Sequence, residues 1–350
     1  MSSVLVTGGC GFVGRHLALN LLKSGHEVWV LDNLFTGKHP DEWLPDYSKQ
    51  TEEHFSTYEK GSQRLVFIEQ DAIDFFRGRL SGADAFTLPA FEEVYHLAAV
   101  VGGRAALIEE NPMLVATNHI IDSLFFMWAV EHKAKVKRVL YISTSVSYPK
   151  VMQDRGKHMA MKEEYLDLAH SELIGLPESI YGWIKLAGEY LAIVAAKKYG
   201  MSVVCVRPFS GYGEDQDFSY PIPSIAARVA RRENPLAVWG SGDQGRDFVY
   251  IDDLVSALRL SIAKVSDGSA VNVGMGRLVT FKEVARIMAG IEGYAPEVKG
   301  LADKAEGSFA VYSDTTLLCS LGWKPMYTVE KGFAKVLGAI KAVLVNGAVN

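Results

Sequence analysis

The sequence is poor in the residues that mark several protein classes. It has three cysteines in 350 residues, too few and too scattered for a disulfide framework, so we expect a reducing, cytoplasmic environment. Its net charge of −5 lacks the basic excess that is typical of nucleic-acid-binding proteins. Its nine histidines form no metal-binding motif with cysteine or glutamate. These absences predict a protein with no metal site and no nucleic-acid partner.

Long apolar runs are also missing. The most apolar stretch, Ile120–Val130, contains Asp122 and Ser123 and falls short of the roughly 18 residues that a membrane-spanning helix needs. The first residues predict a strand, so we expect neither a signal peptide nor a membrane anchor. With 49% hydrophobic and 22% charged residues, the composition is that of a globular protein with a sizeable core.

Short runs rich in β-branched residues alternate with helical stretches along the chain. Strands that flank long helices predict βαβ units, and hence a parallel sheet covered on both faces. We therefore expect an α/β fold of the Rossmann type, a doubly wound parallel sheet with a smaller C-terminal lobe. The predicted strands are Val4–Val6, Val28–Leu31, Leu65–Ile68, Val94–Leu97, Val139–Ser143, Val203–Val206 and Val271–Val273.

Two polar stretches interrupt this alternation. Residues 36–64 predict an extended loop with a short helical turn, and residues 150–175 predict a second irregular segment before a long helix that ends at Gly200. After Phe209, aromatic residues and prolines predict a less regular lobe. We expect residues 1–208 to form the sheet domain, with a return to it around residues 245–275. Residues 209–350 should form most of the smaller lobe.

Glycines cluster between the first predicted strand and the first predicted helix, in the sequence TGGCGFVG. Both Gly8, Gly11 and Gly14 and the alternative set that starts at Gly9 fit the spacing of a dinucleotide-binding turn. One glycine permits the tight turn, one lets the backbone approach a pyrophosphate, and one lets the helix pack on the strand. The cluster therefore predicts a dinucleotide site.

The residues after this turn refine the choice of cofactor. Phe12 and Val13 begin the helix, whose N-terminus offers free N–H groups and a positive dipole end to phosphates. Asp32 ends the next predicted strand, where a carboxylate binds a ribose diol and repels a 2′-phosphate. The arrangement predicts NAD rather than NADP.

Five ordered motifs resemble the extended short-chain dehydrogenase/reductases and, within them, the nucleotide-sugar epimerase and dehydratase family. They are TGGCGFVGRHL, LDNLFTGK, VYHLAA, YGWIK and GSGDQGRDFVYIDDL. The resemblance runs from residue 4 to about residue 323 and implies an NAD-dependent enzyme that acts on a nucleotide-diphosphate sugar. It also implies a homodimer, formed through helices near residues 113–132 and 180–199. The further cofactor contacts that it implies are Asn33, Asp71, Ala72, Leu97, Ala98, Ala99, Asn118, Tyr181, Lys185 and Pro208.

The resemblance implies a catalytic set of Thr144, Tyr181 and Lys185. A tyrosine and a lysine four residues apart lie on one face of a helix, so the ammonium can lower the pKa of the phenol from about 10 toward the useful range of a base. The Thr144 hydroxyl would hydrogen-bond the reacting sugar oxygen. Tyr327 and Lys331 have the same spacing. Only Tyr181, however, lies between the hydroxyl-bearing strand and the next strand, where the family places its base.

The residues beside Thr144 distinguish the reactions of the family. Dehydratases carry an acidic pair there and hexuronate decarboxylases a glutamate, whereas this chain has Ser145, Val146 and Ser147. A narrower likeness, in AAVVGGRAALIEENP, SYPK and MKEEYL, is to GDP-fucose synthase and GDP-mannose 3,5-epimerase, which enolise a ketone with a cysteine and a histidine or lysine. Val146 and Tyr220 occupy those two positions. Neither suits that role, because valine has no proton to move and a phenol is a poor carbon base.

We therefore expect 4-epimerisation through a transient 4-keto sugar. A 4-keto-sugar reductase or a C3/C5-epimerase is an alternative, and a non-catalytic NAD-sensing protein is an alternative of another class. Arg246 is expected to bind the diphosphate, since a guanidinium matches phosphate geometry, unless it pairs with Asp243 or Asp247. Ser210 and Lys304 stand where the family has asparagine and arginine. The complete set of predicted substrate residues is Gly102, Gly103, Arg104, Ser145, Ser210, Tyr220, Arg246 and Lys304.

Overall fold

One nine-stranded sheet dominates the computed structural model, which describes residues 2–83, 85–101, 112–156, 158–166, 168, 175–177, 179–304 and 307–345. Across this sheet the strands are β13 (Asp267–Val273), β8 (Ser202–Pro208), β7 (Val136–Ile142), β6 (Phe91–His96), β1 (Ser3–Thr7), β2 (Glu27–Asp32), β5 (Gln63–Glu69), β4 (Ser56–Lys60) and β3 (Ser48–Thr51). The strands from β13 to β5 run parallel, β4 is antiparallel to β5, and β3 is antiparallel to β4. Each predicted strand falls on one of the parallel strands, within a few residues at its ends.

Helices cover both faces of the sheet. The helices α3 (Ala72–Leu80), α4 (Pro112–Glu131) and α5 (Ile180–Tyr199) pack together on one face, and α1 (Phe12–Lys23) and α7 (Ile251–Lys264) pack on the other. Each face has its own core of buried apolar side chains. The expected doubly wound α/β fold is confirmed. Within the described ranges, no helix is both long enough and apolar enough to cross a bilayer.

Residues 36–64 are more regular than the sequence indicates. The expected helical turn is α2 (Pro40–Trp43), but the segment predicted as an extended loop contains the hairpin β3–β4, which extends the sheet beyond β5. Tyr58 on β4 lies opposite Leu65, is buried, and donates a hydrogen bond to Asp41. The loop prediction was wrong because an edge hairpin with one exposed face carries little apolar alternation, and its pairing with β5 is a long-range interaction.

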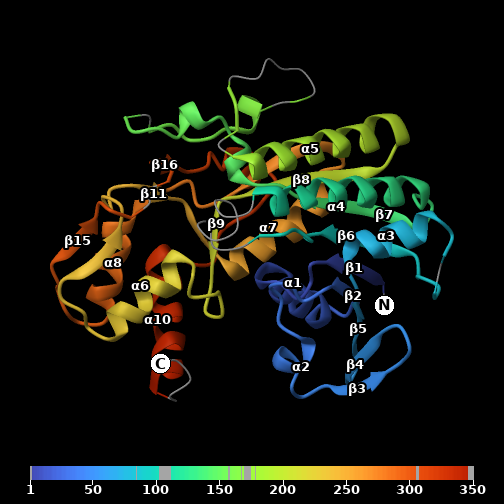
Figure 1. The fold of residues 1–350 in the computed structure, drawn as a ribbon, viewed down its shortest axis with the longest axis horizontal. Coiled ribbons are helices and arrows are strands. Elements are labelled where there is room, and N and C mark those ends of the chain that lie inside the picture. Colours follow the sequence, from blue (N-terminus) through green and yellow to red (C-terminus); the bar gives the residue numbers. More distant parts are fainter. Residues whose placement is uncertain are drawn as a thin grey trace.

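The remaining elements form a smaller lobe beside the sheet. In Figure 1, α6 (Pro221–Ala230), α8 (Phe281–Ile291), α10 (Val329–Val345) and β15 (Val298–Leu301) lie together at the left. The pairs of short strands are β10 (Leu236–Trp239) with β15, β12 (Phe248–Tyr250) with β9 (Ser210–Tyr212), and β11 (Gly245–Arg246) with both β14 (Val279–Thr280) and β16 (Ala310–Val311). Between these elements, the chain returns to the large sheet as β13.

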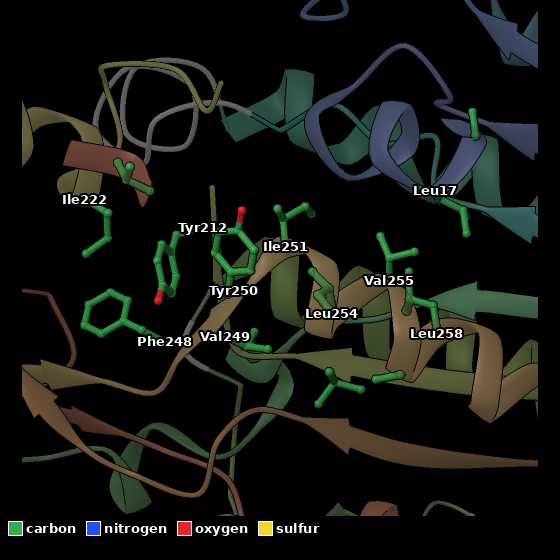
Figure 2. Packing of buried hydrophobic residues seen from close by; sticks show 14 of the residues in the cluster. Leu17, Tyr212, Ile222, Phe248, Val249, Tyr250, Ile251, Leu254, Val255 and Leu258 are labelled. Carbon is green, nitrogen blue, oxygen red and sulfur yellow. The ribbon is translucent and has the colours of Figure 1, made fainter. Parts of the chain in front are cut away.

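A single hydrophobic core joins the lobe to the sheet. Figure 2 shows side chains of α7, from Ile251 to Leu258, between Leu17 on α1 and the aromatic pair Tyr212 and Phe248. All of these side chains are buried. Because the same helix packs on the sheet and on the lobe, the position of the lobe beside the sheet is fixed by packing rather than by a flexible linker.

A glycine on α5 tests how tightly the helix packs on the sheet. A Cβ added at Gly188 would lie 2.0 Å from the Tyr141 hydroxyl oxygen, whereas a Cβ added at Gly338 on α10 meets nothing within 4 Å. We expect Gly188→Ala to lower the free energy of unfolding by about 1–3 kcal/mol through overpacking. The matched variant Gly338→Ala should raise it by about 0.5–1 kcal/mol through helix propensity. Urea unfolding midpoints measure both effects, and a stabilised Gly188→Ala would contradict the tight packing.

Candidate active site

The glycine turn between β1 and α1 requires glycine at two positions. Gly8 has φ +69°, and a Cβ there would lie 2.7 Å from the Ala98 nitrogen. At Gly14, a Cβ would lie 2.2 Å from the Gly8 carbonyl oxygen. Gly11 is the N-cap of α1 and provides no side-chain cap, so the N–H groups of the first turn, Phe12 to Gly14, are left for an external anion. The turn therefore fits a pyrophosphate.

Asp32 lies at the end of β2, directly against this turn. Its carboxylate accepts hydrogen bonds from the Cys10 nitrogen at 2.9 Å and the Leu34 nitrogen at 2.8 Å. Burial raises the pKa of Asp32, and the backbone N–H groups partly offset that effect. Each carboxylate oxygen has a second lone pair, so Asp32 can also accept hydrogen bonds from a ribose diol. These residues fit NAD.

Other predicted cofactor residues line the same edge of the sheet. Asn33 donates a hydrogen bond to Asp71 at 2.8 Å, and Asp71 caps α3, which begins at Ala72. Asn118 on α4 is fully buried and holds the loop after β6 by accepting from the Val100 nitrogen at 2.6 Å and donating to the Val100 oxygen at 3.0 Å. That loop carries Leu97, Ala98 and Ala99. Asn118 therefore fixes the position of the loop that follows β6.

Tyr181 and Lys185 lie in the first turns of α5. Ser179 caps this helix by accepting a hydrogen bond from the Gly182 nitrogen at 3.3 Å, so the helix begins just before the tyrosine. Gly200 ends the helix in a left-handed conformation, as the sequence indicates. The tyrosine and lysine share a helix face, and the Lys185 ammonium nitrogen lies 5.9 Å from the centroid of the Tyr181 ring.

Thr144 follows β7 and caps the short 3₁₀ helix η2 (Ser145–Ser147) by accepting from the Val146 nitrogen at 3.3 Å. This helix packs directly on the first turn of α5, because a Cβ at Gly182 would lie 2.4 Å from the Val146 oxygen. Ser147 also donates a hydrogen bond to the Gly182 oxygen at 3.3 Å. The structure thus brings Thr144 beside the turn that carries Tyr181. Ser145 is buried in η2.

Lys185 forms an ion pair that the sequence analysis did not predict. Lys185 is fully buried, and its ammonium nitrogen lies 3.4 Å from both carboxylate oxygens of Asp122 on α4. Burial raises the pKa of Tyr181, and the charge of Asp122 and the Tyr220 phenol raise it further. Asp122 stands out in the sequence only as a charge within an apolar run. The residues near Asp122 in the sequence do not indicate that its partner lies on another helix.

Four of the predicted substrate residues, Ser210, Tyr220, Arg246 and Lys304, lie in the smaller lobe, and the predicted cofactor residue Pro208 lies just before it. Pro208 ends β8, Ser210 begins β9, and Tyr220 caps α6 close enough to Tyr181 for their phenols to interact electrostatically. Lys304 is exposed beside Asp303 at 4.0 Å. Gly102, Gly103 and Arg104 lie outside the described residues.

Arg246 on β11 is held by the lobe itself. Its guanidinium donates to the Ser308 oxygen at 2.7 Å and lies 5.9 Å from the Phe281 ring centroid. Of the two possible partners that the sequence suggests, Asp243 pairs with Lys282 at 2.9 Å. Asp247 accepts hydrogen bonds from the backbone after β13 and from Ser313.

A second buried ion pair supports the helix that carries Tyr181. Arg207 on β8 pairs with Glu189 on α5 at 2.6 Å, and both side chains are buried. Ser143 at the end of β7 also donates to Glu189. These contacts fix α5 against the carboxyl ends of β7 and β8. In the part of the chain that the structure describes, no group of three histidine, cysteine or acidic side chains could hold a metal ion.

Comparisons with known proteins agree with this geometry. The NAD-dependent epimerase/dehydratase family matches residues 4–274. UDP-glucuronic acid decarboxylase 1 of Xenopus tropicalis is 27% identical over 99% of this chain and 74% of its own length. GDP-L-fucose synthase of Escherichia coli is 28% identical over 79% of this chain and 88% of its own length.

A solved structure, UDP-glucose 4-epimerase of Thermotoga maritima with UDP-glucose, is 26% identical with a TM-score of 0.77 and covers 98% of this chain and 99% of its own. These relatives are similarly distant from the chain and have different activities, so overall similarity does not choose among them. The family match covers most of the chain and includes the glycine turn, Asp32, Thr144, Tyr181 and Lys185. The protein therefore belongs to the NAD-dependent epimerase/dehydratase family.

Proposed function

We propose that the protein is an NAD-dependent 4-epimerase of a nucleotide-diphosphate sugar. The observation that carries this proposal is that Thr144 lies beside the helix turn that carries Tyr181, with the buried Lys185 one turn further along α5 and no acidic residue in η2. A dehydratase or decarboxylase would need an acid beside Thr144, where this chain has Ser145, Val146 and Ser147. The likeness to the Thermotoga maritima 4-epimerase supports the same reaction.

The proposed mechanism uses proton transfer at oxygen alone. The glycine turn and Asp32 would hold NAD, whose nicotinamide would supply a reversible hydride acceptor for sugar carbon 4. Tyr181 takes the proton of the C4 hydroxyl and gives it back after the 4-keto sugar has turned over. Thr144 donates a hydrogen bond to that oxygen, and the positive charge of Lys185 stabilises the phenolate. No group has to remove a proton from carbon, which suits a site that has Val146 where related enzymes have a cysteine.

Among the described residues, those proposed to hold the two ligands come from the carboxyl edge of the large sheet and from the smaller lobe. Those for the cofactor are Gly8, Gly11, Phe12, Val13, Gly14, Asp32, Asn33, Asp71, Ala72, Leu97, Ala98, Ala99, Asn118, Tyr181, Lys185 and Pro208. Those for the sugar nucleotide are Gly102, Gly103, Arg104, Ser145, Ser210, Tyr220, Arg246 and Lys304. With Asp32 at the ribose position, a 2′-phosphate would meet a like charge, which favours NAD over NADP. We also propose residues 1–208 as the NAD-binding domain, with the chain returning to it around residues 245–275.

A cytoplasmic homodimer is the proposed state of the protein. The large apolar side chains Ile120 and Met127 on α4, and Trp183 and Tyr190 on α5, are between 43% and 58% exposed. Because α4 and α5 pack side by side, these residues suit an interface with a second copy. We expect a mass of twice 38.4 kDa in sedimentation equilibrium, and a monomer would contradict the proposal.

The cytoplasmic location is supported by cysteines that are all unpaired.

The reaction can be tested by incubating the purified protein with a panel of nucleotide sugars in deuterated water. We expect a C4 isomer without carbon-bound deuterium, because the hydride is returned internally and the protons move only at oxygen. Mass spectrometry and NMR detect the isomer and any deuterium. Deuterium on carbon would instead indicate enolisation, as in a C3/C5-epimerase. Stoichiometric oxidation of added NADH or NADPH would indicate a 4-keto-sugar reductase.

The role of Tyr181 can be tested by comparing two tyrosines with the same spacing to a lysine. We expect Tyr181→Phe to lower kcat by at least about 100-fold, because the base is lost, with binding of NAD retained. The matched variant Tyr327→Phe should keep its activity within about twofold, since the Tyr327 ring contacts Tyr250 outside the proposed site, with the two ring centroids 4.3 Å apart. Steady-state kinetics and NAD titration measure both effects. A Tyr181→Phe enzyme with normal kcat would refute the assignment.

A further inference from the structure

The buried carboxylate of Asp122 is an unusual feature of α4. The side chain is 1% exposed, and it lies in a stretch of α4, Ile120–Val130, whose only other polar residue is Ser123. It accepts hydrogen bonds from the Tyr141 hydroxyl at 2.6 Å and from His96 at 3.2 Å, in addition to its ion pair with Lys185. A charge in the interior is costly unless it is paired and hydrogen-bonded. Three donors from three elements therefore satisfy a carboxylate at the base of the proposed active site.

The position of the Lys185 ammonium relative to its two neighbours is informative. The nitrogen lies 3.4 Å from both Asp122 oxygens but 5.9 Å from the centre of the Tyr181 ring. It also lies 4.8 Å from the centre of the Tyr141 ring, which packs between β7 and α5. The ammonium thus binds the carboxylate, and the negative charge cancels part of the field that the positive charge exerts on the phenol.

We propose that Asp122 is a positioning residue for the reaction, which anchors Lys185 through a buried ion pair and limits how strongly the ammonium charge acts on Tyr181. The inference rests on the proposed function, since it assumes that Tyr181 is the base. In this arrangement Tyr181 is held as a neutral phenol while Lys185 remains bound to Asp122. A shift of the ammonium away from Asp122 would favour the phenolate.

The electrostatics of the cluster agree with its geometry. Burial by itself raises the pKa of Asp122, but Lys185, His96 and Tyr141 more than offset this effect and hold it below its usual value. Asp122 is therefore ionised at neutral pH. Burial raises the pKa of Tyr181, and the Asp122 charge is the next contribution in the same direction.

Glu189, one helical turn after Lys185, is a second buried carboxylate, and it is paired with Arg207. The groups that face Tyr181 and Lys185 themselves come from several elements. They are Asp122 on α4, His96 on β6, Tyr141 on β7, Cys205 on β8 and Tyr220 at the start of α6. Burial raises the pKa of the thiol and of the phenols and lowers that of His96, so these groups are neutral at neutral pH. Removing Asp122 is therefore the change that alters the charge around Tyr181.

The direct test is to titrate Tyr181 in the variant Asp122→Asn. The full-length protein is labelled with ¹³C at the tyrosine ring carbon that bears the hydroxyl, and the Tyr181 signal is the one missing in Tyr181→Phe. We expect this signal to begin to move toward its ionised position about one pH unit lower in Asp122→Asn than in the unmodified protein. A signal that titrates as in the unmodified protein would overturn the proposal.

Asp253 offers a matched control. It is a fully buried carboxylate on α7, on the other face of the sheet, and accepts hydrogen bonds from the Met326 nitrogen at 2.7 Å and the Tyr327 nitrogen at 3.0 Å. Asp253→Asn removes a buried charge without touching Lys185, so Tyr181 should titrate as in the unmodified protein. An equal downward shift in this variant would mean that the effect is a general consequence of destabilisation, and the proposal would fail.

A second variant keeps the test decisive if Asp122→Asn does not fold. Tyr141→Phe removes one donor to Asp122 but leaves the carboxylate and its ion pair in place. Since the negative charge is then less well compensated, Tyr181 should titrate at the same or a higher pH. A downward shift in Tyr141→Phe would overturn the proposal, because it would follow from disturbing the cluster rather than from removing the charge.

Kinetics then separate this inference from the proposed function. If Tyr181 is the base, the rising limb of the pH profile of kcat/KM moves down in Asp122→Asn by the same amount as the NMR transition. If the phenol signal moves and the rising limb does not, Asp122 controls the phenol as inferred but Tyr181 is not the base. In that case it is the proposed mechanism that fails.

Discussion

The parallel alignment of β13 to β5 is the constraint on which the proposed site depends. Because the carboxyl ends of parallel strands meet at one edge, residues far apart in the sequence become neighbours there. Thr7 and Asp32 end β1 and β2, and Thr144 and Pro208 come at the ends of β7 and β8. The glycine turn packs closely against backbone at this edge, since a side chain at Gly8 or Gly14 would collide with it. Both proposed ligands can then reach the same row of strand ends.

Two buried ion pairs fix the helix that carries Tyr181. Lys185 pairs with Asp122 on α4, and Glu189, one turn later, pairs with Arg207 on β8. Burying these charges costs free energy that pairing offsets only when the geometry is good, so their contribution is to orientation more than to stability. Between the two pairs, the contact of Gly188 with Tyr141 sets how closely α5 lies on the sheet.

The sequence predicts the parts of the molecule that local patterns encode. The glycine turn, the apolar strands and the helix from Ile180 to Tyr199 each depend on neighbours within a few residues, and the structure has all three. The hairpin β3–β4 was predicted as a loop because its pairing with β5 is a tertiary contact. Asp122 was overlooked for the same reason. Its partners His96, Tyr141 and Lys185 lie on three other elements, and only the fold brings them together.

The core shared by α7 and the smaller lobe has a consequence for how a ligand enters. Swinging the lobe away from the sheet would expose Tyr212, Phe248 and the side chains around Ile251, at about 1.5–3 kcal/mol for each large side chain. Arg15 and His16 on α1 also contact the carboxylate of Asp215 at the start of the lobe. Movement of the whole lobe away from the sheet therefore has a large free-energy cost. Exchange of a nucleotide sugar at the proposed site would therefore take place with the lobe held in position on the sheet.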